Sequence, residues 1–395
     1  MLLTGIFSVI SYFKSSIRTD PLYAPDIALF NKVVGMEGVW VFKSQFFILP
    51  IIVGLIFILS FFLIPNGRVF PIKWLKKLIL SVVSASLLIC YSVGFVVNDS
   101  LLIKMGIDYN FYTIFESYKQ NGFIFSFINN MKFLNMPKPE NYSEDKISEI
   151  VSKLKNSEIK NQKTIKPNII YVMCEAFYDF TKYPELGING DPFPNFHKLQ
   201  KEGISGQMNV SVFGGGTADT EFEVMTGLSK DFLPAGTVAY MQYCNKKRDG
   251  IVSLCDSLGY YNVAIHPYDK TYWQRDRIYK LWGFDKFITE SDLINPKRAG
   301  KYISDDEIYK SLINEFENKG DKPLMSYIIT MENHYPFFPG EDTSTRIFKA
   351  TGNVPEASKN YIERYLVGAS HDDKLLGDLV TYFKNISEPT IIIFY

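Results

Sequence analysis

Polar side chains that could do chemistry follow three short apolar runs of the sequence. Glu175, His266 and His334 occupy these positions. A carboxylate can bind a cation or accept a proton, and an imidazole can move a proton near neutral pH. Short runs rich in β-branched residues predict strands buried on both faces of a sheet. The runs are NIIYVM (168–173), YNVAI (261–265) and LMSYIIT (324–330).

Helical segments alternate with these runs, and the alternation predicts the fold that positions the three side chains. The segment Ile251–Leu258 precedes YNVAI, and a long helical pattern over Lys359–Lys384 precedes a last apolar run, Thr390–Tyr395. Such alternation implies an α/β domain over residues 166–395, with a mostly parallel sheet flanked by helices. Because ligands bind outside the carboxyl ends of parallel strands, the three side chains are expected to share one site.

A glycine run supplies a further candidate, in the segment FGGGTADTEF (213–222). Glycines let the backbone approach a bound group closely. Thr217 follows them where a helix is predicted to begin, with Asp219 and Glu221 in its first turn. Free N–H groups and the helix dipole at such a point favour a phosphate or a developing alkoxide. The alternative is a flexible glycine turn in which Thr217 is an ordinary N-cap.

Two uncharged apolar stretches predict transmembrane helices within residues 1–98. They are Phe46–Ile64 and Leu78–Val97, each about the 20 residues that cross roughly 30 Å of hydrocarbon. The loop Asn66–Lys77 between them is basic and lacks acidic residues, so the positive-inside rule places it in the cytoplasm and everything after Asn98 outside the cell. A pair of buried helices in a soluble core is the alternative, although such helices usually show a polar face.

Residues 99–165 connect this membrane region to the α/β domain. Residues 99–135 are rich in Phe and Tyr with scattered lysines, which is typical of helices lying along a membrane surface. A short helix is predicted from about Ser143, and Lys155–Lys166 has the composition of a polar linker. The 42 basic and 42 acidic residues argue against a nucleic-acid partner, and the 15% aromatic content suits a lipid interface.

Four segments of the chain resemble, in order, the motifs of one enzyme family. They are NIIYVMCEAFYDF, FGGGTADTEFEVMTG, HPYDKTYWQRDRIYKLWGFDKF and TMENHYPF. They are similar to successive motifs of lipoteichoic acid synthases and related sulfatase-like phosphoglycerol transferases of the alkaline phosphatase superfamily. The resemblance runs from about Phe123 to Tyr395 and implies a sulfatase-like α/β fold.

The resemblance also implies a reaction and a cofactor. Such enzymes use a divalent metal, commonly Mn²⁺ or Mg²⁺, so that Glu175 corresponds to a metal ligand and Thr217 to both a ligand and the nucleophile. Thr217 would attack the phosphorus of phosphatidylglycerol, release diacylglycerol and hold a glycerophosphoryl group. The hydroxyl of a glycolipid or glycan acceptor would then take that group. Hard cations prefer oxygen ligands, which agrees with these two side chains.

By the same resemblance, Trp273 and Arg275 in TYWQRD contact the glycerophosphate, while His266 and His334 line the pocket. An arginine can form paired hydrogen bonds to phosphate oxygens. Each assignment has a simpler alternative. Trp273 could have a packing role alone. Arg275 could form a surface ion pair with Asp276, and the histidines could be structural.

The remaining cysteines and histidines match no motif. Cys174 is not expected to be a nucleophile, because no sequence signal for activation lies near it. A disulfide between Cys244 and Cys255 is an open alternative if the domain is exported, since spacing alone does not settle pairing. His197 and His371 are interpreted as structural.

The chain also departs from the family pattern. The family's last metal motif, Gly-Asp-His, follows the strand equivalent to TIIIFY, and the sequence stops at Tyr395. The chain is therefore expected to be a fragment that binds metal weakly and does not turn over, and the family usually has more membrane spans than the pair predicted here. The expected protein is a multi-pass enzyme of the cell membrane with an extracellular catalytic domain. Alternatives are a phosphoethanolamine transferase or phosphatase-like hydrolase on the same scaffold, or a non-catalytic membrane-bound homologue.

Overall fold

The computed structural model describes residues 2–18, 21–23, 26, 74–91, 98–105, 107, 114–131, 141–155, 165–212, 215–233, 237–335 and 346–395. The chain divides into two compact units. The N-terminal unit comprises Met1–Ser157 and Asp231–Val238, and the sheet unit comprises Glu158–Lys230 and Ala239–Tyr395.

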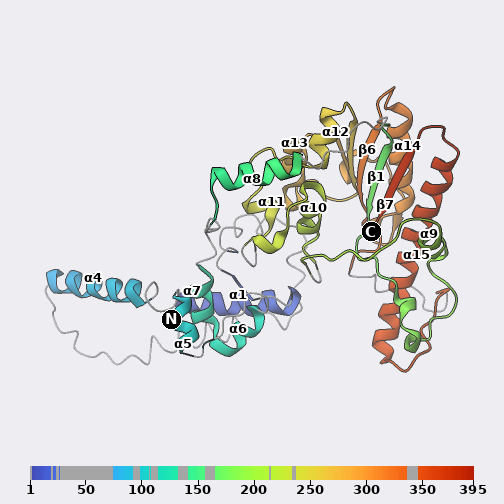
Figure 1. Ribbon diagram of the computed structural model, residues 1–395. Helices are drawn as coiled ribbons and strands as arrows, with labels where there is room; N and C mark the ends of the chain where they lie inside the picture. The colour runs from blue at the N-terminus through green and yellow to red at the C-terminus, as the bar shows by residue number, and fades with distance from the viewer. Residues whose placement is uncertain are drawn as a thin grey trace. The chain divides into compact units, whose positions relative to one another are not determined.

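The sheet unit is built on a five-stranded, all-parallel sheet in the order β3-β2-β6-β1-β7 (Figure 1). All four apolar runs identified in the sequence form strands, so the predicted parallel α/β sheet is confirmed. The edge strand β3 was not predicted. The strands are β1 (Asn168–Met173), β2 (Tyr261–His266), β3 (Lys286–Thr289), β6 (Leu324–Ile329) and β7 (Thr390–Phe394). A separate antiparallel pair is formed by β4 (Arg298–Ala299) and β5 (Tyr302–Ile303).

Helices cover both faces of this sheet. On one face α14 (Asp305–Asn318) and α15 (Glu356–Lys384) form an apolar core with alternate residues of β1, β2 and β6. Helix α12 lies on the other side, next to β2 (Figure 1). The start of α14 is stabilised by Ser304, whose side chain accepts the Asp306 N–H. The remaining helices are α9 (Pro194–Glu202), α10 (Thr217–Thr226), α11 (Ala239–Gln242), α12 (Ile251–Ser257) and α13 (Arg275–Trp282), and the 3₁₀ turns are Phe180–Lys182, Pro184–Leu186, Lys230–Phe232, Tyr272–Gln274 and Glu290–Asp292.

The central strand β6 is expected to dominate the stability of the sheet unit, since all six of its residues are buried. Replacing the fully buried Ile328 by Ala leaves a cavity between the sheet and its helices. The free energy of unfolding should fall by about 2–5 kcal/mol. Ile391→Ala on the edge strand β7, where the side chain is 49% exposed, is the matched control and should cost less than about 1 kcal/mol. Urea unfolding of both variants checks this, and equal losses would contradict it.

The N-terminal unit is helical in the part of the chain that the structure describes. The predicted span Phe46–Ile64 lies outside the described residues. The span Leu78–Val97 overlaps α4, which is described over Trp74–Tyr91, and its residues 92–97 lie outside the described residues. No helix among the described residues is both long and apolar enough to cross a membrane. The helix predicted from Ser143 is present as α8, with Ile147, Ile150, Val151 and Leu154 all exposed. The helices are α1 (Leu2–Arg18), α4 (Trp74–Tyr91), α5 (Asp99–Lys104), α6 (Ile114–Asn121), α7 (Phe123–Asn130) and α8 (Glu144–Lys155).

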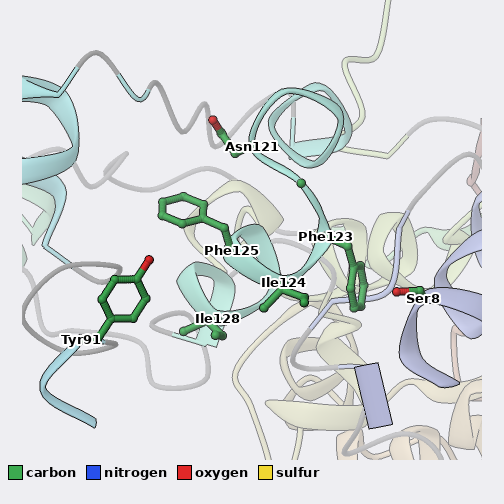
Figure 2. A pocket seen from close by; sticks show the side chains of 8 residues that line it. Ser8, Tyr91, Asn121, Phe123, Ile124, Phe125 and Ile128 are labelled. Atoms are coloured by element: carbon green, nitrogen blue, oxygen red, sulfur yellow. The ribbon is translucent and has the colours of Figure 1, made fainter. Parts of the chain in front are cut away.

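An open apolar hollow of about 480 Å³ lies in the N-terminal unit (Figure 2). It holds none of the site residues predicted from the sequence. The described residues that line it are Ser8, Tyr91, Asn121, Gly122, Phe123, Ile124, Phe125 and Ile128.

Candidate active site

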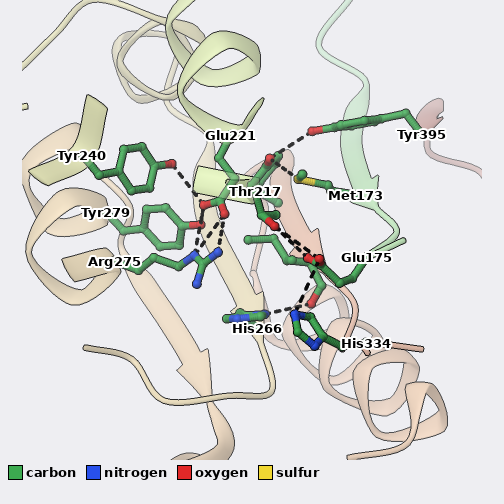
Figure 3. Close-up of polar contacts among 12 residues, drawn as sticks. Met173, Glu175, Thr217, Glu221, Tyr240, His266, Arg275, Tyr279, His334 and Tyr395 are labelled. Carbon is green, nitrogen blue, oxygen red and sulfur yellow. Dashed lines mark hydrogen bonds and ion pairs between the residues drawn. The ribbon is translucent and has the colours of Figure 1, made fainter. Parts of the chain in front are cut away.

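Three neighbouring strands deliver the predicted polar side chains to one edge of the sheet. Strands β2, β6 and β1 are adjacent and parallel. Their carboxyl ends bring together His266, His334 and Glu175, as the sequence predicts (Figure 3). His334 Nε2 lies 3.9 Å from Glu175 Oε1. This edge is where ligands bind in open parallel sheets.

Thr217 joins Glu175 at this edge. Its Oγ1 donates to the Glu175 carboxylate, at 3.1 Å from Oε2 and 3.2 Å from Oε1 (Figure 3). The N-cap of α10 is Gly216, with φ 76°, and Thr217 is the first helical residue. The alternative of Thr217 as an ordinary N-cap is therefore wrong. A hydroxyl at the positive end of a helix dipole, held by a carboxylate, is placed to act as a nucleophile.

Glu175 is fixed by its backbone as well as by Thr217. Its N–H donates to Thr330 Oγ1 at 3.0 Å. The next residue, Ala176, has φ 62°, in the left-handed region that side chains rarely adopt. Burial raises the pKa of the Glu175 carboxyl, and electrostatic interactions with His334 and Arg275 oppose that rise. A carboxyl held in this way gains most from a cation placed beside it.

The two histidines differ in their surroundings. His266 is 2% exposed, and its Nδ1 lies 3.2 Å from the carbonyl oxygen of Ile329. A carbonyl only accepts, so Nδ1 carries the proton and Nε2 is left as an acceptor. Burial, followed by the charge of Arg275, lowers the pKa of His266 well below its ordinary value, which keeps the ring neutral. The side chain of His334 is 40% exposed.

Arg275 lies at the start of α13 and is 2% exposed. Its Nε is 3.1 Å from both carboxylate oxygens of Glu221, and its Nη2 also donates to Glu221 (Figure 3). The alternative of a surface ion pair with Asp276 is therefore wrong. Tyr240 and Tyr279 donate to the same carboxylate at 3.1 and 2.6 Å. The Nη1 of Arg275 is buried and has no hydrogen-bond partner among the described residues.

Trp273 lies two residues before this arginine, in a strained segment. Trp273 and Gln274 have φ 56° and 59°, so two consecutive non-glycine residues are in the left-handed region. Such strain persists only where the surroundings impose it, and it clusters at functional sites. Trp273 is half-buried, and its ring lies 5.3 Å from that of Tyr272. Its contact with a glycerophosphate remains a prediction.

A family comparison agrees with this geometry. The sulfatase family model matches residues 167–395, more than half of the chain. The chain belongs to the sulfatase family. That family is part of the alkaline phosphatase superfamily, and the parallel sheet with Glu175 and Thr217 at its carboxyl edge lies wholly inside the matched region.

Two curated proteins are similar to this sulfatase-family chain. It is 31% identical over 280 residues to a putative cyclic beta-1,2-glucan modification protein of Rhizobium meliloti, covering 71% of this chain and 43% of that protein. It is 26% identical over 268 residues to the lipoteichoic acid synthase of Staphylococcus saprophyticus, covering 64% of this chain and 40% of that protein. The chain therefore spans less than half the length of these relatives.

A solved structure shares the fold. The Streptococcus pyogenes phosphoglycerol transferase GacH, in complex with sn-glycerol-1-phosphate, superposes with a TM-score of 0.59 at 24% identity. The match covers 66% of this chain and 69% of that chain. Distant homologues of the sulfatase-family chain thus include a lipoteichoic acid synthase, and its fold is that of a phosphoglycerol transferase.

The oxygen donors Glu175 and Thr217 fit a divalent metal in kind but not in number. Carboxylate and hydroxyl oxygens suit Mn²⁺ or Mg²⁺. Across the described residues, no group of three or more His, Cys, Asp and Glu side chains could hold a metal ion. Within the described residues, Glu175 and Thr217 would therefore be part of a metal ligand set.

The other cysteines and histidines of the sheet unit have structural surroundings. Burial, with help from Asp372 and Asp305, raises the pKa of the Cys174 thiol well above its ordinary value, so the nucleophilic thiolate is disfavoured. Cys244 and Cys255 are both buried and free, and the disulfide left open by the sequence is absent. His197 contacts Asp179 and Asp191, and His371 contacts Glu332.

Asp305 and Asp372 form a buried acidic pair near Cys174 and Thr330. The sequence did not predict this pair. Asp305 and Asp372 are 2% and 0% exposed, and their carboxylate oxygens meet no donor at good hydrogen-bond geometry among the described residues. Burial raises the pKa of Asp372 to about 7 and, together with Asp372 and Glu332, raises that of Asp305 well above its ordinary value. We interpret the two as sharing a proton in the folded protein, because like charges so deeply buried cannot both ionise.

The pair of Asp305 and Asp372 predicts the direction in which the stability of the folded protein changes with pH. Between about pH 4 and pH 7 the folded protein holds a proton on Asp372 that the unfolded chain has lost, so stability falls as pH rises. Asp372→Asn keeps the shape, and its amide can donate to Asp305. The variant should have a higher Tm than wild type at pH 8 and a flatter Tm profile from pH 5 to 8. Asp378→Asn, an exposed carboxyl on the same helix paired with Lys374, should keep the wild-type profile. Parallel profiles for all three proteins would contradict the shared proton.

Proposed function

We propose that this protein transfers glycerol phosphate from phosphatidylglycerol to an acceptor hydroxyl outside the cell membrane, through a covalent intermediate on Thr217. The observation that carries the proposal is the Thr217 hydroxyl. It lies at the amino end of α10, within 3.2 Å of both Glu175 oxygens, at the ligand-binding edge of a sulfatase-family sheet. Such a hydroxyl is suited to attack phosphorus, because its developing negative charge is stabilised there.

The reaction has two balanced displacements. In the first, Thr217 Oγ1 forms a bond to phosphorus, the bond from phosphorus to the diacylglycerol oxygen breaks, and the leaving oxygen receives the proton lost by Thr217. In the second, an acceptor hydroxyl attacks the same phosphorus and gives up its proton, and Thr217 leaves as a hydroxyl again. Covalent catalysis of this kind divides one difficult transfer into two easier ones.

The other side chains have separate tasks. Arg275 Nη1 donates to a phosphoryl oxygen, since it is the one nitrogen of this guanidinium with no hydrogen-bond partner among the described residues. The Nε2 of neutral His266 can accept a proton during attack. His334, whose side chain is 40% exposed, can contact the acceptor. Glu175 and Thr217 would hold a divalent metal, which when bound would lower the pKa of the hydroxyl and neutralise phosphoryl charge.

The acceptor is proposed to be a glycan or glycolipid. The support is indirect: the relatives named above are a putative glucan modification protein and a lipoteichoic acid synthase. The membrane location rests on the sequence, in which Phe46–Ile64 and Leu78–Val97 are apolar and the loop between them is basic. Protease digestion of intact cells tests that location, since only an outward-facing sheet unit would be cut.

The test of the function starts from the gene. Sequencing past the Tyr395 codon shows whether the frame continues with Gly-Asp-His, which would complete the metal ligands. The protein of the complete reading frame is then incubated with phosphatidylglycerol vesicles, Mn²⁺ and a glucan acceptor, and diacylglycerol is measured. Metal-dependent release of diacylglycerol supports the proposal. Release from phosphatidylethanolamine instead identifies a phosphoethanolamine transferase, and phosphate release from a monoester identifies a phosphatase. A stop codon after Tyr395 with no release from any donor leaves a non-catalytic homologue.

A further inference from the structure

Glu221 is the most deeply buried charge of the site and has no role in the reaction just described. Its carboxylate is 0% exposed. It lies four residues after Thr217, which is one turn along α10 on the same face. It accepts from Arg275 and from the hydroxyls of Tyr240 and Tyr279 (Figure 3). A fully buried carboxylate with three donors is rigidly placed.

The ion pair with Glu221 uses the Nε and Nη2 donors of Arg275 and leaves its Nη1 donors without a partner among the described residues. Nε and Nη2 face Glu221, so Nη1 points away from the carboxylate. The charge of Arg275 affects the rest of the site, because it opposes the burial-driven pKa rise of Glu175 and contributes to the low pKa of His266. Any anion bound beside Thr217 therefore experiences both Arg275 and the opposite charge of Glu221.

We infer that Glu221 sets the charge preference of the phosphate site, so that a doubly charged phosphomonoester gains no advantage over a singly charged phosphodiester. The inference rests on the proposed function, whose donor and product are both phosphodiesters. An unpaired arginine would attract a dianion about twice as strongly as a monoanion, because Coulomb energy scales with ligand charge. Paired with Glu221, Arg275 still donates hydrogen bonds through Nη1, but the pair has no net charge to reward the second negative charge.

The consequence is a site in which free phosphomonoesters do not outcompete the phosphodiester through their extra charge. A transferase that held dianions tightly would be blocked by phosphate or glycerol phosphate in its surroundings. Specificity of this kind comes from a repulsive element as much as from an attractive one. The competing explanation is that Glu221 only joins α10 to α13, in which case its removal would alter stability without altering the ratio of the two affinities.

The experiment compares two probes with the same glycerol group. Glycerol 1-phosphate is a dianion at pH 8, above its second pKa of about 6, and glycerophosphoglycerol is a monoanion. Dissociation constants are measured by NMR titration of the purified chain in metal-free buffer, so turnover is not required. The ratio of the two constants cancels effects common to both ligands, including any loss of Arg275 orientation.

Glu221→Gln removes the charge and preserves the shape, and the Gln amide can donate to Tyr240 and Tyr279. The ratio should shift toward the monoester by roughly tenfold, the scale of one charge interaction in a partly buried site. Glu223→Gln, the same change on α10 at a carboxylate bound by Ser211 and Ser229, should leave the ratio within about twofold. Tyr279→Phe keeps the charge and should also leave the ratio unchanged. An unchanged ratio in Glu221→Gln overturns the inference.

The wild-type chain gives a second test that does not depend on the folding of Glu221→Gln. Its affinities for the two probes should agree within about threefold, because the neutral pair gives the dianion little advantage. A monoester bound more than about tenfold tighter overturns the inference, and so does the absence of binding by either probe at millimolar concentration. Diacylglycerol release tests the proposed function separately, so the two can fail independently.

Discussion

Thr217→Ala should abolish diacylglycerol release from phosphatidylglycerol, with a loss of at least about 10³-fold, since removal of a covalent nucleophile leaves only binding and charge stabilisation. The fold should be retained. Thr217 is the first residue of α10 and not its cap, and its side chain makes hydrogen bonds only to Glu175 among the described residues. The measurement is turnover by the protein of the complete reading frame, together with its Tm.

Two further variants make the result specific to the hydroxyl. Thr217→Ser keeps the hydroxyl and should retain part of the activity. Thr226→Ala removes a threonine hydroxyl from the same helix, one that donates to the Phe222 carbonyl, and should leave turnover near wild type. Mass spectrometry of a stalled reaction should find the glycerophosphoryl group on Thr217. Turnover by Thr217→Ala at more than about a tenth of the wild-type rate would rule out the covalent route.

The features that the sequence predicted correctly are those that local pattern determines. NIIYVM, YNVAI and LMSYIIT form β1, β2 and β6 because fully buried parallel strands need continuous apolar runs. The placement of Glu175 and His266 at one edge follows from chain direction alone. The edge strand β3 was missed, because KFIT has four residues and begins with an exposed lysine, a pattern that no run-based argument separates from a loop.

The partners within the site were not predictable in the same way. Glu221 and Arg275 are 54 residues apart, and no periodicity connects α10 with α13. The sequence placed Glu221 in the first turn of the helix that begins at Thr217, whereas only Asp219 lies in that turn of α10. Nothing in the sequence indicated that the Glu221 carboxylate would be buried. The same holds for Asp305 and Asp372, which lie on separate helices and read as ordinary solvent-facing acids. Tertiary packing alone brings these charges together.

The buried pair of Glu221 and Arg275 leads to the largest expected effect on stability. Arg275→Met fills similar space but leaves the Glu221 carboxylate buried with only two tyrosine donors. Removing one partner of a buried ion pair costs about 3–5 kcal/mol, because the remaining charge is uncompensated. The free energy of unfolding in urea should fall by that amount.

The double variant Arg275→Met/Glu221→Gln separates this cause from simple loss of packing. With the carboxylate neutralised, most of the lost stability should return, giving a coupling energy of at least about 2 kcal/mol between the two positions. Arg298→Met is the matched control, because Arg298 pairs with Glu290 at the surface, with side chains 44% and 40% exposed. It should cost less than about 1 kcal/mol. If Arg275→Met costs no more than Arg298→Met, or the double variant recovers nothing, then Arg275 does not neutralise Glu221. The phosphate site would then lack the charge balance inferred for it.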